Sequence, residues 1–184
     1  MRIDPDLFLG GFAPRLRFLQ FNNIPFPGLP KLLLSATHLV TLRLHEIPNS
    51  GYISPEAVVT ALSALTSLKE FELHFHSPRS CPDQASRRPP HSTRSVLPIL
   101  TWFWFKGVTE YLEDLVARID APQLNSLHII FFIDLAFDTL QLMQFITAVA
   151  HQCQDLLKKP GLSLRLAAPA STSHHRHLAT GRSV

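Results

Sequence analysis

Leu39-Val40-Thr41-Leu42-Arg43-Leu44 is one copy of a phrase that occurs five times in this chain. In each copy a leucine is followed, three and five positions later, by two further apolar residues. The copies begin at residues 16, 39, 68, 100 and 124, so their spacings are 23, 29, 32 and 24 residues. The last two apolar residues alternate with other side chains, which is the pattern of a strand with one buried face.

A phrase of this form, recurring at this period, is typical of leucine-rich repeats, in which each copy supplies one strand and a return segment. We therefore predict an α/β fold, an irregular leucine-rich-repeat solenoid with a parallel concave sheet and convex helices. The predicted core comprises the last two apolar residues of every copy: Leu19, Phe21, Leu42, Leu44, Phe71, Leu73, Phe103, Phe105, Leu127 and Ile129.

Four of the return segments carry helix signals. Helices are expected to begin at Pro30, at Ser54-Pro55, at Thr109 and near Asp138. The helix capped by Thr109 has an apolar stripe that continues to Ile119. A last apolar phrase, Leu162 to Leu166, could add a sixth strand to the sheet.

The 184 residues suit one domain. We place a leucine-rich-repeat domain at residues 7–166 and a disordered tail at 167–184. Residues 77–95 are rich in proline and serine and nearly free of aliphatic side chains, so we predict a disordered loop inside the domain. Cys81 and Cys153 lie far apart and form no disulfide framework, which favours a reducing compartment.

Charge and hydropathy argue against nucleic acid and membrane as partners. The net charge is +3, and its arginines gather in the predicted loop and tail without interleaved aromatic residues that could stack on bases. The N-terminus carries Asp4, Pro5 and Asp6 where a secretory signal would be apolar. The longest apolar stretch is interrupted by Asp134 and is too short to span a bilayer. We expect a cytoplasmic or nuclear protein.

The residues that alternate with the predicted core should form one continuous surface on the concave sheet. In chain order they are Phe18, Gln20, Asn22, Thr41, Arg43, His45, Glu70, Glu72, His74, Trp102, Trp104, Lys106, Ser126, His128 and Ile130. Trp102 and Trp104 are the candidate anchors, because tryptophan is enriched at binding hot spots. A strand shifted by one residue, or cover of this face by the loop from Ser77 to Ser95, would instead make both tryptophans ordinary core.

Mixed charge on this surface favours a protein partner over a nucleic-acid backbone. Glu70 and Glu72 are expected beside Arg43 and Lys106, and the two carboxylates are interpreted as a solvated face rather than a catalytic pair. The residues predicted to bind a protein substrate are Arg43, Glu70, Glu72, Trp102, Trp104, Lys106 and His128.

We find no motif for catalysis or for a cofactor. His74-x-His76 has strand spacing, and His174, His175 and His177 cluster in the tail, but neither group has a third ligand at metal-site spacing. The chain is therefore not expected to be an enzyme, and no cofactor or metal is assigned. A metal-dependent hydrolase built on His74 and His76 is the most distant alternative.

Several longer stretches resemble the leucine-rich-repeat half of fungal F-box proteins. They include Ile24-Pro25-Phe26-Pro27, the run from Leu29 to Val40, Gly51 to Glu56, Phe103 to Val108 and Tyr111 to Pro122. The resemblance covers roughly residues 7 to 147, and this combination of phrases is more specific than any single repeat.

The resemblance implies a substrate-recognition domain of a ubiquitin-ligase receptor, in which the repeats hold a protein substrate. In that family an F-box binds the Skp1-type adaptor of a cullin-based ligase. No F-box-like helical segment precedes the first repeat in this sequence, so adaptor binding is expected only if an F-box lies upstream. The alternative is a truncated or degenerate repeat protein without independent function.

Overall fold

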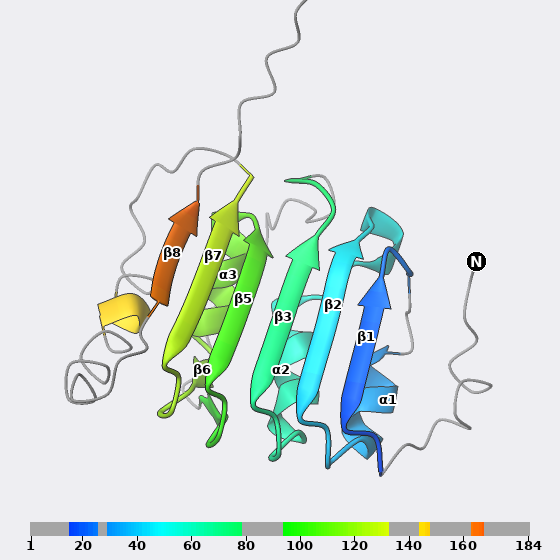
Figure 1. Cartoon of the computed structure of the whole chain (residues 1–184). Helices are drawn as coiled ribbons and strands as arrows, with labels where there is room; N and C mark the ends of the chain where they lie inside the picture. Colours follow the sequence, from blue (N-terminus) through cyan, green and yellow to red (C-terminus); the bar gives the residue numbers. More distant parts are fainter. Residues whose placement is uncertain (1–14, 26–28, 79–93, 133–143, 148–162, 168–184) are drawn as a thin grey trace, which may run out of the picture.

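The computed structural model describes residues 15–25, 29–78, 94–132, 144–147 and 163–167 (Figure 1). Six strands of this part of the chain form one sheet in the order β1-β2-β3-β5-β7-β8, and each pairs with its neighbour in parallel. They are β1 (Phe18–Asn22), β2 (Thr41–Ile47), β3 (Glu70–Phe75), β5 (Trp102–Gly107), β7 (Ser126–Phe131) and β8 (Ser163–Ala167). The predicted α/β class and parallel sheet are confirmed.

The five copies of the phrase coincide with β1, β2, β3, β5 and β7, and they align in register. Leu42 pairs with Leu19 on one side and with Phe71 on the other. Phe103 pairs with Phe71 and Leu127 in the same way. Because residues in register point to the same side of a parallel sheet, one face is continuously apolar. Every predicted core residue is buried, none with more than 8% of its surface exposed.

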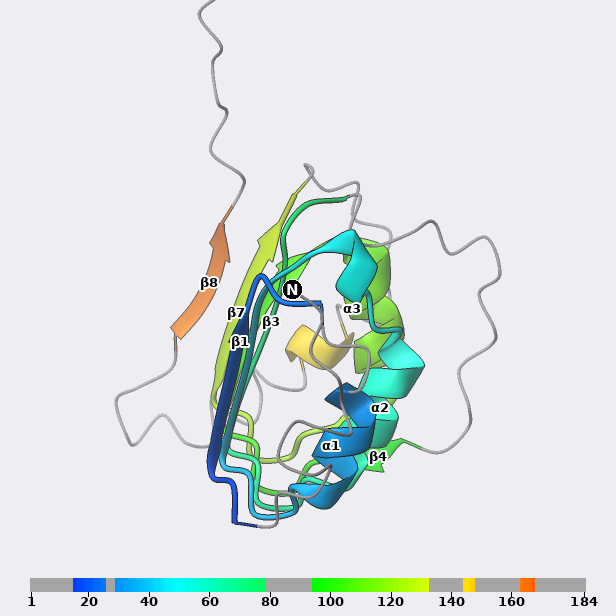
Figure 2. The ribbon, with the colours of Figure 1, turned by 90° about the vertical axis from the view of Figure 1, so that its right-hand side faces the viewer.

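Three helices pack against this apolar face, namely α1 (Leu29–Ser35), α2 (Pro55–Ser63) and α3 (Thr109–Val116). Figure 2 shows them together on one side of the sheet. The N-terminus of α2 forms as expected, since Ser54 Oγ accepts a hydrogen bond from Ala57 N at 3.2 Å and Pro55 occupies the first helical position. A short 3-10 helix, η2 (Asn49–Gly51), joins β2 to α2.

The prediction for α3 was wrong at both ends. Thr109 is the first helical residue rather than the cap, and Val108 holds the cap position without a side-chain hydrogen bond. The helix ends at Val116, and Ile119 belongs to a strand, β6 (Ile119–Asp120). Ile119 is buried in the strand, as it would have been in a longer helix. Its apolar side chain therefore fitted the helical spacing by chance.

The partner of β6 is β4 (Ser95–Val96), which the sequence did not predict. Ser95 N donates to Arg118 O at 2.8 Å, and Leu97 N donates to Asp120 O at 2.7 Å. The predicted loop, placed at 77–95, therefore ends one residue too late.

Several predictions concern residues outside the described ranges. These are the loop residues 79–93, the helix start at Asp138, the two cysteines and the tail from residue 168. Residues 144–147 are helical, and the sixth strand, β8, is present at residues 163–167. It extends one residue past the expected domain boundary at 166.

The pairing of β2 with β3 contains an irregularity. The pairing passes from Leu44 with Leu73 to Ile47 with Phe75, so two residues of β2, His45 and Glu46, lie opposite one residue of β3. Glu46 has a φ of 50°, in the left-handed region. This is a β-bulge, a feature that re-aims side chains and is common beside functional sites.

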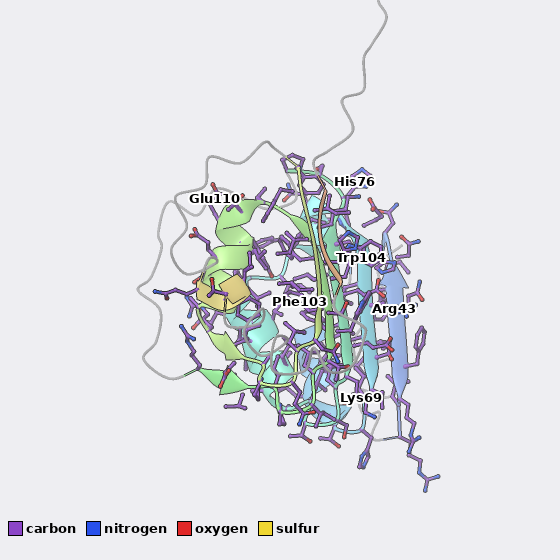
Figure 3. All side chains as sticks on the ribbon, turned by 60° about the vertical axis from the view of Figure 1, so that its left-hand side comes forward. Arg43, Lys69, His76, Phe103, Trp104 and Glu110 are labelled. Atoms are coloured by element: carbon purple, nitrogen blue, oxygen red, sulfur yellow. The ribbon has the colours of Figure 1, made fainter. Side chains whose placement is uncertain are left out.

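The second face of the sheet carries the residues that alternate with the core. In Figure 3 Phe103 lies between the sheet and the helices, whereas Trp104 and Arg43 project from the opposite side. Within the described residues no helix covers that side, which we call the open face. It is formed by Arg43, His45, Glu70, Glu72, His74, Trp102, Trp104, Lys106 and His128.

Candidate functional site

All seven residues predicted to bind a partner lie on the open face. Strand register places Arg43, Glu72, Trp104 and His128 in one row across β2, β3, β5 and β7. Glu70 and Trp102 are paired in the next row. The predicted side of the sheet is therefore confirmed for these residues, while their role in binding stays a prediction. The one-residue slip that would have made Trp102 and Trp104 core does not occur.

Arg43 joins the two carboxylates of β3, as the sequence predicted. Its terminal Nη2 lies 3.3 Å from Glu70 Oε2, and its Nε lies 2.8 Å from Glu72 Oε1. The second contact is an ion pair in which the Nε–H group does not form a well-directed hydrogen bond. The Arg43 guanidinium thus binds both the exposed carboxylate of Glu70 and the buried carboxylate of Glu72.

The expectation that Glu70 and Glu72 form a solvated pair was wrong for Glu72, whose side chain is only 3% exposed. A buried carboxylate is costly unless it is paired. Glu72 is paired twice, because Oε1 faces Arg43 and Oε2 forms a 2.5 Å hydrogen bond with His45 Nε2. Both partners come from β2, so they were not apparent from the spacing of residues along β3.

Two imidazoles stack beside this carboxylate. The rings of His45 and His74 lie parallel, with centroids 4.5 Å apart and an angle of 5° between their planes. The bulge in β2 explains the contact, since it sets His45 and Glu46 opposite His74. One face of the His74 ring is therefore covered by a side chain from the neighbouring strand.

His74 is the most strongly perturbed group of the face. Burial lowers its pKa to about 3, and the positive charges available at His45, Lys106 and His128 act in the same direction against the opposing effect of Glu46. Its Nε2 atom is buried and has no hydrogen-bond partner among the described residues. A neutral imidazole with an unused polar atom is unusual in a well-packed structure.

The tryptophans are half-buried rather than freely exposed. The ring of Trp104 stacks on His128, with centroids 5.0 Å apart, and meets His74 edge-on at 4.2 Å. Trp102 touches Trp104 in an edge-to-face contact with centroids 6.0 Å apart. Trp104 Nε1 is buried without a hydrogen-bond partner in the described part of the chain. Trp104 thus packs between neighbouring side chains of the open face, while Trp102 lies beside Trp104.

Lys106 does not join Glu70 and Glu72. Its Nζ lies 2.8 Å from Glu46 Oε1, and His76 Nδ1 contacts the other oxygen of the same carboxylate at 3.1 Å. Partial burial by itself raises the pKa of Glu46, but the Lys106 ammonium and His76 outweigh it and hold that pKa below its ordinary value. Glu46, the bulge residue, is therefore held as a carboxylate anion by Lys106 and His76.

The pairing of His74 with His76 was the wrong basis for a metal site. His76 is exposed and bonded to Glu46, whereas His74 is buried against His45. Among the described residues, the group that could hold a metal ion is instead His45, Glu72 and His74. The tail histidines lie outside the described ranges.

Sequence reasoning missed the role of His45 and Glu46. A signal for His45 was present, because aligning the five phrases puts His45, His74 and Lys106 at equivalent positions. No signal marked Glu46, whose side chain reaches the open face through the left-handed backbone of the bulge.

Together these features define an α/β protein with helices on one face of a parallel sheet and a polar, aromatic cluster on the other. No family model matches the chain, and neither the curated proteins nor the solved structures include a significant match. No helix in the described part of the chain is long and apolar enough to cross a membrane.

Proposed function

We propose that this chain is a leucine-rich-repeat module that binds a protein partner on its open face. One observation carries the proposal, the position of Trp102 beside the row of Arg43, Glu72, Trp104 and His128 on a sheet face that no described helix covers. Aromatic residues and arginine are the side chains most enriched at binding hot spots.

The regularity of the sheet supports the repeat class. Five copies of one phrase supply five strands that are adjacent in chain order. The leading leucines of the last four copies, Leu39, Leu68, Leu100 and Leu124, are each no more than 1% exposed, as expected for a turn that closes over a shared core.

The charge pattern supports a protein as the partner. Arg43 and Lys106 are each already paired with a carboxylate, so the face offers no uniformly basic stripe for a phosphate backbone. A rim of paired charges around aromatic side chains is the usual anatomy of a protein interface.

By its resemblance to the repeat half of fungal F-box proteins, the module would serve as the substrate-recognition domain of a ubiquitin-ligase receptor. The substrate would lie across β2, β3, β5 and β7. Binding of a Skp1-type adaptor would require an F-box, which belongs upstream of the repeats in that family.

The proposal can be tested by affinity purification from cells of the source organism, with the tagged chain as bait. Trp102→Ala is the main variant, because Trp102 is half-buried at the side of the cluster. Leu34→Ala is the matched control, since Leu34 is 50% exposed on α1, away from the open face. We expect a protein that is retained by the parent and by the control but lost with Trp102→Ala.

The captured protein is then purified and its affinity measured by calorimetry. A hot-spot tryptophan contributes about 2 kcal/mol or more, so Trp102→Ala should weaken binding at least about 30-fold. If no captured protein depends on Trp102, the interaction module is refuted and a degenerate repeat protein becomes the better description.

A further inference from the structure

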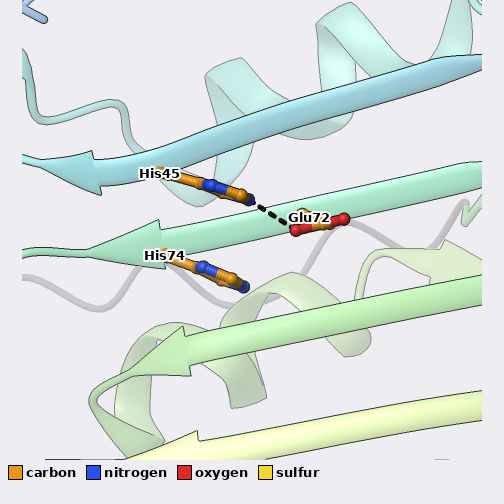
Figure 4. Close-up of side chains that lie close together, drawn as sticks. All are labelled: His45, Glu72 and His74. Atoms are coloured by element: carbon orange, nitrogen blue, oxygen red, sulfur yellow. Dashed lines mark hydrogen bonds and ion pairs between the residues drawn. The ribbon is translucent and has the colours of Figure 1, made fainter. Parts of the chain in front are cut away.

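Three side chains on the open face have ligand atoms close enough to share one ion. His45, Glu72 and His74 each offer one such atom, and these atoms all lie within 4.8 Å of one another (Figure 4). The figure shows the His45 imidazole directed at the carboxylate, with the His74 imidazole lying alongside that of His45. The three residues come from only two strands, so the arrangement depends on the bulge at His45 and Glu46.

An independent observation also points to a ligand. The His74 side chain is only 5% exposed, and its Nε2 has no hydrogen-bond partner in the described structure. A buried polar atom that is left unpaired destabilises the folded state, so such atoms usually have a partner. The His74 ring is held by its stack on His45 and its edge-on contact with Trp104, and neither contact supplies a hydrogen bond to Nε2.

We propose that His45, Glu72 and His74 form a binding site for a divalent transition metal, with Zn²⁺ as the best fit. The ligand atoms are His45 Nε2, His74 Nε2 and Glu72 Oε2. A donor set of two imidazoles and one carboxylate binds Zn²⁺ in preference to the hard cations Mg²⁺ and Ca²⁺. Three protein ligands leave one tetrahedral position for water or for a group of a bound molecule.

Binding requires a local rearrangement. The ion replaces the hydrogen bond between His45 and Glu72, so that Oε2 exchanges one partner for another. The rings leave their parallel stack, because ligand bonds of about 2.0–2.1 Å place tetrahedral donor atoms roughly 3.4 Å apart. His45 makes the larger movement, since its side chain is 22% exposed whereas His74 is enclosed.

Arg43 acts on the site through Glu72. Its contact with Oε1 fixes the carboxylate and leaves Oε2 directed at the imidazoles. Such outer contacts orient a metal ligand, although the guanidinium charge also opposes the ion. The single carboxylate and this nearby cation make moderate rather than very tight affinity the expectation.

The test is a calorimetric titration of the metal-free full chain with Zn²⁺. The background carries His174→Gln, His175→Gln and His177→Gln, so that the tail histidines cannot supply a competing site. We expect about one equivalent of Zn²⁺ to bind. Binding should weaken at least about 100-fold in His45→Gln and in Glu72→Gln. The matched control, His76→Gln, alters an exposed histidine of the same segment and should bind as the background does.

Folding is verified by circular dichroism for every variant. His74→Gln changes an enclosed side chain, so His45→Gln, at a partly exposed position, is the decisive variant if His74→Gln unfolds. Co²⁺ substitution supplies a second readout, since coordination by two imidazoles gives an absorption spectrum that His45→Gln should abolish. Unchanged affinity in folded His45→Gln, loss of binding in His76→Gln, or no stoichiometric binding at all would overturn the proposal. None of these readouts involves a protein partner, so they are independent of the proposed interaction.

Discussion

His74 lies within β3 with its imidazole almost entirely removed from water, and this burial makes metal-free stability depend on pH. The folded-state pKa is about 3, below the ordinary value of 6.5. As the pH falls below 6.5, the unfolded chain gains a proton that the folded chain does not accept. Stability is therefore intact above pH 6.5 and declines as the pH falls toward 3, with a limiting slope of about 1.4 kcal/mol per pH unit.

Urea denaturation in a chelating buffer between pH 7 and pH 4.5 measures this loss. The comparison is His74→Phe, which keeps a ring in the stack and removes the titrating group. We expect the parent to lose about 2.5 kcal/mol more than the variant over this range. Parallel pH profiles for the two proteins would show that His74 titrates normally in the folded state.

The two tryptophans should respond differently to truncation. Trp104 contacts His74, His128 and Trp102, whereas the one aromatic contact described for Trp102 is with Trp104. Trp104→Ala should cost on the order of 2 kcal/mol of folding free energy, and Trp102→Ala less than about 1 kcal/mol. Thermal unfolding of both variants checks the order, and equal destabilisation would contradict the division of roles.

At the scale of a single element, β7 shows what the repeat phrase contributes. Leu127 is 1% exposed, and it lies in register with Phe103 of β5 on one side and with Leu164 of β8 on the other. Leu127→Ala should cost about 2–5 kcal/mol, because it removes buried methyl groups and leaves a cavity. The same substitution at exposed Leu34 should cost less than about 1 kcal/mol. Chemical denaturation compares them, and a small effect at Leu127 would argue against a tightly packed core.

The strands were predictable because one physical rule, alternate burial, repeats five times in the sequence. Any copy could be misread alone, but five copies in phase are not a chance pattern. The end of α3 was not predictable in this way. Ile119 satisfies the helical spacing and is buried in the strand β6 as well, so hydrophobic period alone does not distinguish the two.

The sequence predicts which residues form the open face, but not which of their side chains contact one another. Alternation assigns Arg43, Glu72 and Trp104 to one side of the sheet, and parallel register brings them together. The bulge depends on backbone conformation at Glu46, which is not a residue that usually marks a left-handed position. The burial of Glu72 and the His45–His74 stack follow from neighbours on β2, so they required the structure.

For the whole molecule, susceptibility to protease should follow the boundaries of the packed sheet. Arg118 is 6% exposed and ion-paired with Asp114 at 2.9 Å, and Arg43 lies in a paired strand, so trypsin should cut slowly at both. Composition predicts the first cuts after Arg79, Arg87 or Arg94, whereas Arg88 is followed by Pro89, which hinders trypsin. Mass spectrometry of a short digest identifies the sites, and early cleavage after Arg43 or Arg118 would contradict this assignment.

Strand order has a consequence for synthesis on the ribosome. In the six-stranded sheet, each strand after β1 pairs with the previous strand of that sheet along the chain. A newly made strand of this sheet therefore meets an edge that already exists, and it does not wait for a partner made later. We expect folding to advance with translation, one strand at a time. The surface that a chaperone must shield is then a single growing edge, which moves along the sheet each time another copy of the phrase emerges.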